Sequence, residues 1–400
     1  MPDAKVSSPE VLLVRYGELS LKGGNRRFFE QTLARNIRNA VEGIAKIHLE
    51  LRHGRIHVIP SRRPREVARR LQDVFGIKTL SPAWSAPNDP DAIVATARAL
   101  LEQALSEETD RVVSFRVRSR RADKRFPLSS GELDRYVAER ILPGHERVRV
   151  QLVDPELELG IEVREKRTWL FHERLTGRAG LPVGTLGRVL CLISGGIDSP
   201  VAAWMAMKRG CHAGFVTYHS YPYIGESAKR KVADLVRVLA RFQGSSRLSV
   251  VPFTETQTAI RDSAPEAYRT VLYRRMMQRI ASELATRHGY KALVTGDSVG
   301  QVASQTLENM TCIAQASSLP ILQPLIGFDK EEIIERARSI GSFEISALPE
   351  PDCCTVFQPR KPMIRGRIEE CLAAEADLDI ESLVRQAADG AELLTIQPDA

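Results

Sequence analysis

A glycine-rich turn at residues 194–200, SGGIDSP, has the residue types of an anion-binding site. It follows the apolar run VLCLI, which is typical of a buried strand, and precedes an apolar segment that suits a helix. Glycines let the backbone approach a phosphate, and their N–H groups join those of a helix N-terminus in an anion-binding nest. Ser199 followed by Pro200 predicts the N-cap and the first residue of that helix. The stretch therefore predicts a phosphate-binding loop, and an ordinary glycine-rich turn that caps a helix is the alternative.

Six cysteines could also do chemistry, at positions 191, 211, 312, 353, 354 and 371, without a CxxC pair. This spacing favours neither a disulfide framework nor a structural zinc site, and on it we assign no residue as a metal ligand. A disulfide between adjacent Cys353 and Cys354 would strain the peptide between them, so these residues would act as thiols. A pair of inert buried cysteines is the alternative. An iron–sulfur cluster is disfavoured without CxxC, although Cys312 could converge with the pair in three dimensions.

Arginines alternate along residues 114–127, SFRVRSRRADKRFP. Phe115 and Val117 fall on one face of the predicted strand, and basic residues fall on the other. The basic row and its continuation comprise Arg116, Arg118, Arg120, Arg121, Lys124 and Arg125. Such a row could follow phosphates, with Phe126 offering one ring for stacking. A charged edge strand that prevents aggregation is the alternative.

The overall charge agrees with a polyanionic partner for the first half of the chain. Residues 1–186 hold 33 Lys and Arg against 25 Asp and Glu, a net +8, whereas residues 187–400 hold 24 against 25, a net −1. Nucleic acid is the commonest partner of such a basic module, and a solubilising surface is the alternative. The N-terminus lacks a signal-peptide core and no apolar run is long enough to cross a bilayer, which predicts a cytoplasmic protein without a membrane partner.

The elements that position these residues differ between the two halves. Residues 1–86 read as strand, helix, two strands, helix, strand, which suits a ferredoxin-like α+β unit, and 82–90 reads as a turn-rich connection. A second α+β unit follows, and the four glycines of 177–187 predict a linker. Beyond it, strands and helices alternate, which predicts a doubly wound α/β domain with a parallel sheet. The last twenty or so residues are acidic and suit one surface helix.

SGGIDSP is similar to the SGGxDS loop of the ATP pyrophosphatases, the PP-loop enzymes that split ATP between its α and β phosphates to adenylate a substrate. It matches neither GxxxxGK[ST] nor GxGxxG. The resemblance implies that four residues cradle the pyrophosphate: Ser194, Gly195, Gly196 and Ser199. It also implies that Asp198 helps to hold a magnesium ion or to organise the reacting phosphates.

The wider chain resembles one PP-loop family, the tRNA 4-thiouridine sulfurtransferases (ThiI). The resemblance rests on motifs in the family's order: RYGELSLKGGNRRFFE, RADKRFP, SGGIDSPVA, RRMMQRIA, LVTGDSVGQVASQTLENM, PLIGFDKEEII and DCCTVF. It implies an N-terminal ferredoxin-like domain at 1–82, a THUMP domain at 83–176, a linker at 177–187 and a PP-loop (adenine nucleotide alpha hydrolase-like) domain at 188–400. The first two would grip the acceptor end of tRNA, with Lys22 as an RNA contact beside the basic row.

Carried over by position, the resemblance puts further residues against the nucleotide: Leu192, Ile193, His219, Ser220, Arg275, Gly296 and Gln305. Strand ends and their loops surround the ligand crevice of such a sheet, and an arginine can neutralise phosphate. Residues 294–304 could instead be a tight strand-to-helix turn, and Arg275 could be one charge on an amphipathic helix.

The family reaction implies the remaining chemistry. ATP and Mg²⁺ adenylate the C4 oxygen of uridine 8 in tRNA, and sulfur carried as a cysteine persulfide from a cysteine desulfurase then replaces AMP to give 4-thiouridine. Cys354 matches the family's catalytic cysteine, and Cys353, Cys312, Cys371 or an external thiol would resolve the sulfur intermediate. Long members append a rhodanese-like domain that serves thiazole synthesis; only about 45 residues follow Cys354 here, so a role in thiamine synthesis is doubtful. A homodimer is the family's habit.

Two other functions remain open on the residues alone. A PP-loop domain could adenylate a small molecule or a carrier protein, because the loop does not name the acceptor. A non-catalytic RNA-binding protein could also have kept the PP-loop fold. Dependence of AMP formation on tRNA separates these alternatives from tRNA thiolation.

Overall fold

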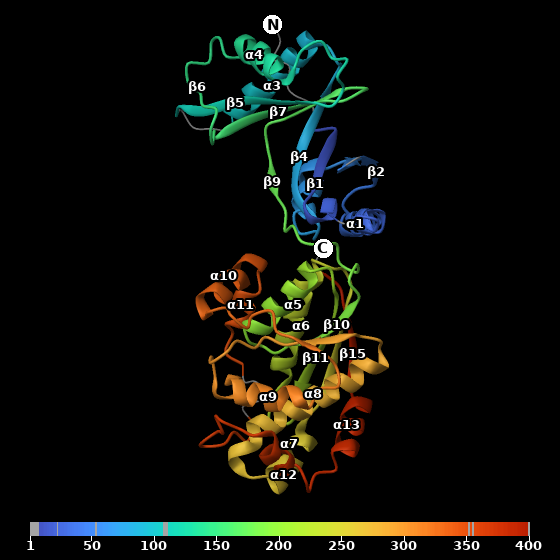
Figure 1. The fold of residues 1–400 in the computed structure, drawn as a ribbon, viewed down its shortest axis with the longest axis vertical. Coiled ribbons are helices and arrows are strands. Elements are labelled where there is room, and N and C mark those ends of the chain that lie inside the picture. Colours follow the sequence, from blue (N-terminus) through green and yellow to red (C-terminus); the bar gives the residue numbers. More distant parts are fainter. Residues whose placement is uncertain are drawn as a thin grey trace. The chain divides into compact units, whose positions relative to one another are not determined.

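The computed structural model describes residues 8–21, 23–52, 54–106, 111–350, 353 and 356–398. Contacts divide the chain into two compact units, Met1–Gly180 (unit 1) and Leu181–Ala400 (unit 2), shown as ribbons in Figure 1. In the part of the chain described, no helix combines the length and apolar character needed to cross a membrane.

Unit 1 is built on one mixed sheet with the strand order β2-β3-β1-β4-β8-β7-β5-β6, and the short β9 pairs with β4. Its elements, in chain order, are β1 (Val11–Tyr16), η1 (Glu18–Leu21), α1 (Arg26–Ala40), β2 (Ile47–Arg52), β3 (Arg55–Pro60), α2 (Pro64–Leu71), β4 (Ile77–Ala86), α3 (Pro90–Ser106), β5 (Val113–Arg121), α4 (Ser130–Ile141), β6 (Val148–Val150), β7 (Leu157–Val163), β8 (Thr168–Phe171) and β9 (Leu175–Thr176). The order of elements through β4 is the ferredoxin-like order that the sequence predicts.

Strand β4 joins the two halves of unit 1. It pairs with β1 through Val11↔Ala83 and with β8 through Trp84↔Leu170, so a single strand belongs to both halves. The sequence predicts a turn-rich connection at 82–90, and this is wrong for Pro82–Ala86, which lie in β4. Pro82 falls between the parts of β4 that pair with β9 and with β8, where a missing N–H is tolerated.

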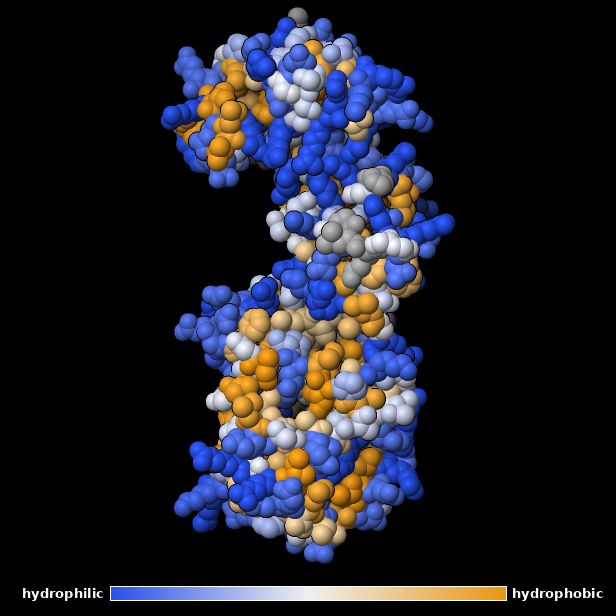
Figure 2. Space-filling view, viewed as in Figure 1, coloured by the Kyte–Doolittle hydropathy of each residue, from blue (hydrophilic) through white to orange (hydrophobic). Residues whose placement is uncertain are grey.

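Strand β5 shows the alternation that its sequence predicts. Phe115 and Val117 are buried in the core under α3 and α4, whereas Arg118 and Arg120 are exposed on the other face. At the edge of this sheet, hydrophobic side chains gather near β6 (Figure 2), and Leu152 is 70% exposed. The helices of this half therefore cover one face of the sheet and leave its arginine-bearing face uncovered by them.

Unit 2 has a six-stranded sheet in the order β14-β13-β10-β11-β12-β15, parallel except for β15. Its elements are β10 (Arg188–Leu192), α5 (Asp198–Lys208), β11 (His212–His219), α6 (Glu226–Ala240), β12 (Ser246–Pro252), α7 (Thr254–Ser263), η2 (Glu266–Tyr268), α8 (Arg269–Arg287), β13 (Ala292–Val294), η3 (Ala303–Gln305), α9 (Leu307–Gln315), β14 (Ile321–Leu322), α10 (Lys330–Ile340), α11 (Phe343–Ser346), α12 (Ile368–Ala374), α13 (Ile380–Asp389) and β15 (Glu392–Ile396). The long helix α8 packs its apolar side against Leu190, Val216 and Leu293 of the sheet. This is the doubly wound α/β arrangement that the sequence predicts.

The predicted linker and the predicted C-terminal helix lie at the two ends of unit 2. In the predicted linker, Gly177 and Ala179 donate hydrogen bonds to Lys78 and Ile77 of unit 1, and Leu181 donates one to Lys208 of unit 2. At the other end, the surface helix that the sequence predicts is present as α13, but the helix does not run to the end of the chain. After α13 the chain forms β15, because alternating Leu and Ile residues complete the edge of β12.

Candidate active site

Two serine hydroxyls form hydrogen bonds inside the loop between β10 and α5 and hold its shape. The Ser199 hydroxyl accepts a hydrogen bond from the Ser194 N–H at 3.0 Å, and the Ser194 hydroxyl accepts one from the Gly196 N–H at 3.3 Å. The predicted capping role of Ser199 is wrong, since α5 begins at Asp198 after an N-cap at Ile197. The hydroxyl instead satisfies a donor inside the loop, which holds the bend at the carboxyl end of β10.

Gly296, just after β13, lies against the start of α5. A Cβ on this residue would lie 2.7 Å from the Ser199 nitrogen and 2.9 Å from the Asp198 carbonyl carbon. Only glycine permits so close an approach of two backbones. Gly296 therefore fixes the distance between the phosphate-loop candidate and the segment after β13.

Two adjoining cavities open at the carboxyl ends of the parallel strands, where sheets of this kind bind ligands. Their volumes are about 250 and 280 Å³, and the lining of both includes Ser194, Gly196, Thr217, Tyr218 and Cys353. The first is also lined by Gly195 and His219, and the second by Asp198, Ser199 and Gly296. The glycine-rich loop thus forms a shared wall of the two cavities.

Most of the nucleotide contacts expected from the sequence lie at these cavities. The expected residues on the cavity walls are Leu192, Ile193, Ser194, Gly195, Gly196, Asp198, Ser199, His219, Gly296 and Gln305. Two expected residues are not among those lining either cavity. Ser220 is fully buried and donates to the Gln257 amide oxygen, which makes it a link between β11 and α7.

Arg275 is the second such residue. Its guanidinium is 0% exposed, pairs with Glu375 at 2.8 Å, and also bonds the Gln315 side chain at 2.9 Å. The adjacent Arg274 lines the second cavity instead. One residue turns a helix by about 100°, so neighbouring arginines on α8 face different surroundings. Residue type alone could not decide which of the two faces the cavity.

Asp297 organises the wall on which Arg274 lies. Its carboxylate accepts hydrogen bonds from Thr295 at 2.7 Å and Gln305 at 3.1 Å, and it forms an ion pair with Arg274. Burial opposes ionisation, but the Arg274 charge and these hydrogen bonds outweigh it and hold the pKa of Asp297 below its usual value. Asp297 therefore stays charged and keeps the cavity wall ordered.

Two buried amide oxygens fit a ligand in the second cavity. The Oε1 atoms of Gln278 and Gln305 have no hydrogen-bond donor among the described residues, and both residues line that cavity. Buried acceptors usually have a partner. A ligand that presents N–H groups, such as an adenine, would supply one.

Two lysines at the loop were missed by sequence reasoning. Lys330, at the start of α10, donates to Asp198 at 2.7 Å. Lys231 of α6 lines the first cavity and donates to the carbonyl oxygens of Ser346 at 2.9 Å and Leu348 at 2.6 Å. Both side chains bring positive charge to the loop. Lys330 belongs to the motif PLIGFDKEEII, to which the sequence analysis gave no role. A basic residue in a family motif could have pointed to this lysine as a phosphate ligand.

The cysteine segment reaches the same place. Cys353 is 8% exposed and lines both cavities, and its carbonyl accepts a hydrogen bond from Gln257 at 2.9 Å. Cys354, the expected catalytic residue, lies outside the described residues. Cys312 and Cys371 are buried in the apolar core, and burial with Cys312 alongside raises the pKa of Cys371 to about 12. Within the described part of the chain, no group of three or more His, Cys, Asp or Glu residues is placed to hold a metal ion.

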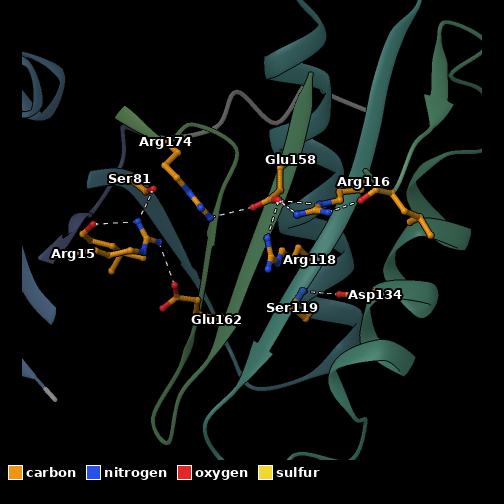
Figure 3. A network of polar contacts seen from close by, with 11 residues as sticks. Arg15, Ser81, Arg116, Arg118, Ser119, Asp134, Glu158, Glu162 and Arg174 are labelled. Atoms are coloured by element: carbon orange, nitrogen blue, oxygen red, sulfur yellow. Dashed lines mark hydrogen bonds and ion pairs between the residues drawn. The ribbon is translucent and has the colours of Figure 1, made fainter. Parts of the chain in front are cut away.

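The residues of unit 1 that were expected to contact RNA differ in whether they pair with a carboxylate or are exposed. Arg116 donates to Glu158 at 2.9 Å and Arg118 lies 3.7 Å from the same carboxylate (Figure 3). Arg120 and Lys124 are exposed. Lys22 lies outside the described residues.

At the end of this basic strand, Arg121 bonds the backbone of the following loop, whereas Arg125 is on the surface. Arg121 donates to the carbonyl oxygens of Phe126 at 3.0 Å and Leu128 at 3.1 Å, and Arg125 is 74% exposed and pairs with Asp123 at 3.0 Å. The predicted stacking role of Phe126 is wrong because its ring is buried in the core of this half. An aromatic residue among charged ones suggests a surface ring, but the turn after β5 directs the Phe126 ring into the core.

Sequence models of three protein families match the chain: the ThiI ferredoxin-like domain at residues 11–81, the THUMP domain at 87–173, and the thiamine biosynthesis protein ThiI at 184–380. A probable tRNA sulfurtransferase of Moorella thermoacetica is 43% identical over 97% of this chain and 98% of its own, and one of Brevibacillus brevis is 43% identical over 97% of each. The crystal structure of a 4-thiouridine synthetase in complex with RNA and bound ATP matches with a TM-score of 0.90 at 35% identity, covering 97% of this chain and all of that one.

The parallel sheet and its glycine-rich loop define a PP-loop α/β protein with preceding ferredoxin-like and THUMP domains, which confirms the fold class predicted from the sequence. The similarity to the tRNA sulfurtransferases extends over nearly the whole chain, which identifies its family. The chain belongs to the ThiI family.

Proposed function

We propose that this protein is an ATP-dependent tRNA sulfurtransferase that converts uridine 8 of tRNA to 4-thiouridine. One observation carries the proposal: the glycine-rich loop and Cys353 line the same two cavities, which supports phosphate binding and thiol chemistry at one site. The names of the similar proteins, tRNA sulfurtransferase and 4-thiouridine synthetase, support the choice of substrate.

In the first step, the C4 oxygen of the uridine attacks the α phosphate of ATP, and pyrophosphate leaves. We assign the pyrophosphate to the backbone N–H groups at the start of α5, since the Ser194 and Gly196 N–H groups already donate to serine hydroxyls inside the loop. Lys330 and Lys231 would add positive charge there. The unpartnered amide oxygens of Gln278 and Gln305 suit the adenine amino group. Asp198 is the loop carboxylate that would hold Mg²⁺ with the phosphates, where the ion would offset their charge.

In the second step, the terminal sulfur of a Cys354 persulfide attacks C4 and AMP leaves. A second thiol then attacks the Cys354 sulfur, so that a disulfide forms and the sulfur on C4 is released as 4-thiouridine. Cys353 lines both cavities and Cys312 and Cys371 line neither, which favours Cys353 or an external thiol for this role. The persulfide would come from a cysteine desulfurase.

The organisation of the chain fits this division of labour. We propose residues 1–82 and 83–176 as the RNA-binding domains, 177–187 as the linker and 188–400 as the catalytic domain. A homodimer, in which the RNA-binding domains of one subunit present tRNA to the other subunit, is part of the proposal.

The test is incubation of the purified protein with unmodified tRNA, ATP, Mg²⁺ and sulfide, followed by measurement of thiolated-uridine absorption. We expect absorption only when ATP and tRNA are both present. Equal AMP formation with and without tRNA would indicate a different acceptor, and absence of tRNA-dependent pyrophosphate release would indicate an RNA-binding protein without this catalysis.

A further inference from the structure

A buried carboxylate in unit 1 is shared by three arginines. Glu162 of β7 lies 3.1 Å from Arg15 of β1 and 3.3 Å from Arg164, and it also forms an ion pair with Arg55 of β3. The Glu162 side chain is 4% exposed. We call these four residues the junction cluster, because Arg15 and Arg55 come from the first half of unit 1 and Glu162 and Arg164 from the second.

The surroundings hold the buried arginines firmly. Arg15 donates to the Ser81 hydroxyl at 2.9 Å, and its guanidinium lies 4.7 Å from the centre of the Phe171 ring. Figure 3 shows Arg15 between Ser81 and Glu162. Because these contacts leave 17% of the Arg15 side chain and 10% of the Arg55 side chain exposed, neither guanidinium can move far to find another counter-charge.

The cluster has more positive charge than its carboxylate neutralises. Burial and the charges of neighbouring arginines lower the pKa of Arg15 to about 10 and that of Arg55 to about 9. A guanidinium does not give up its proton at neutral pH, so this unfavourable energy remains in the folded protein. A bound anion would stabilise these charged arginines, because an opposite charge nearby favours the charged form.

A second carboxylate on the same strand repeats the pattern. Glu158 lies 3.0 Å from Arg174 and also pairs with Arg116 and Arg118 (Figure 3). Side chains four positions apart in a strand point to the same face, so both groups of arginines lie on one face of the sheet. The positive charge of Arg174 also lowers the pKa of Arg15, which indicates that the two groups of arginines interact electrostatically.

We propose that the junction cluster, together with Arg174 of the neighbouring Glu158 group, binds a phosphate of the RNA backbone, with Arg164 and Arg174 as the residues that touch it. Their side chains are 36% and 47% exposed, while the more buried Arg15 and Arg55 supply a fixed positive field behind them. This site rests on the proposed function. It would be the place where the junction between the two halves of unit 1 holds tRNA. A cross-link that only holds the two halves together is the structural alternative.

The experiment measures affinity of the full chain for unmodified tRNA by fluorescence anisotropy at several salt concentrations. Arg164→Met and Arg174→Met should each weaken binding and reduce the slope of log affinity against log salt by about one. Arg135→Met is the matched control, since Arg135 is exposed on α4, which covers the opposite face of the sheet. Wild-type affinity and slope in both junction variants would overturn the inference.

Glu162→Gln separates a phosphate site from a cross-link while preserving side-chain shape. A phosphate site gains one unit of net positive charge, so tRNA should bind at least as tightly as to the wild type at low salt. A cross-link loses its central charge, and tRNA binding should weaken together with the melting temperature. If the wild-type protein makes 4-thiouridine and only these junction predictions fail, the inference is wrong and the proposed function stands; a wild-type protein that binds no tRNA would sink the proposed function itself.

Discussion

Replacement of Gly296 by alanine tests how closely the two loops of the site must approach. The added Cβ would meet the Ser199 nitrogen at 2.7 Å and the Asp198 carbonyl carbon at 2.9 Å, both of them backbone atoms at the start of α5. Ordinary contacts begin near 3.4 Å, so the segment after β13 and the glycine-rich loop must separate by about 0.7 Å. Backbone cannot turn aside as a flexible side chain can.

The size of the effect follows from that displacement. Insertion of a methyl group into a close-packed contact typically costs about 1–3 kcal/mol of unfolding free energy. A displacement approaching 1 Å between a catalytic loop and its substrate can cost about 100-fold in rate. We therefore expect Gly296→Ala to lower kcat/KM for AMP formation by about 10- to 100-fold while tRNA affinity is unchanged.

The assay follows AMP release from labelled ATP in the presence of unmodified tRNA, with urea unfolding measured in parallel. Gly327→Ala is the matched control, because a Cβ at Gly327 would meet no atom within 4 Å. We expect that control to keep wild-type activity and stability to within about 0.5 kcal/mol. Wild-type AMP formation by the Gly296→Ala protein would refute the argument that this close approach sets the geometry of the phosphate site.

Three further substitutions probe the remaining parts of the site. Lys330→Met should lower AMP formation by about 100-fold with tRNA affinity unchanged, because it removes the charge that faces Asp198 and the phosphates; an unchanged rate would exclude this role. Arg275→Met should lower the free energy of unfolding by about 3–5 kcal/mol in urea, because it leaves the Glu375 carboxylate buried in a weaker ion-pair network. Selective loss of ATP binding at wild-type stability would show instead that Arg275 is a nucleotide ligand. Cys354→Ser should abolish 4-thiouridine but retain tRNA-dependent AMP release, and normal thiolation by that variant with a persulfide donor would contradict the assignment of the cysteine.

The sequence was sufficient to predict the site because the residues for chemistry and the residues that shape the backbone lie in one short segment. SGGIDSP has both the glycines of a ligand loop and the strand and helix on either side, and the cavities form there. The order of strands and helices was predictable for the same reason, because periodicity is local.

What could not be predicted depends on contacts between distant segments. The burial of Arg275 requires knowledge that Glu375, a hundred positions away at the end of α12, forms an ion pair with it. The extension of β4 through Pro82 requires knowledge of which strands lie on each of its edges. The sharing of Glu162 by three arginines depends on a sheet that brings β1, β3 and β7 together.

The most direct measurement of the central claim uses ATP labelled at the α or the γ phosphate, with wild-type protein and unmodified or already thiolated tRNA. The account predicts equal amounts of AMP and pyrophosphate, formed only with unmodified tRNA and lost in Asp198→Ala. Release of orthophosphate in place of pyrophosphate, or AMP formation that ignores the state of the tRNA, would contradict it.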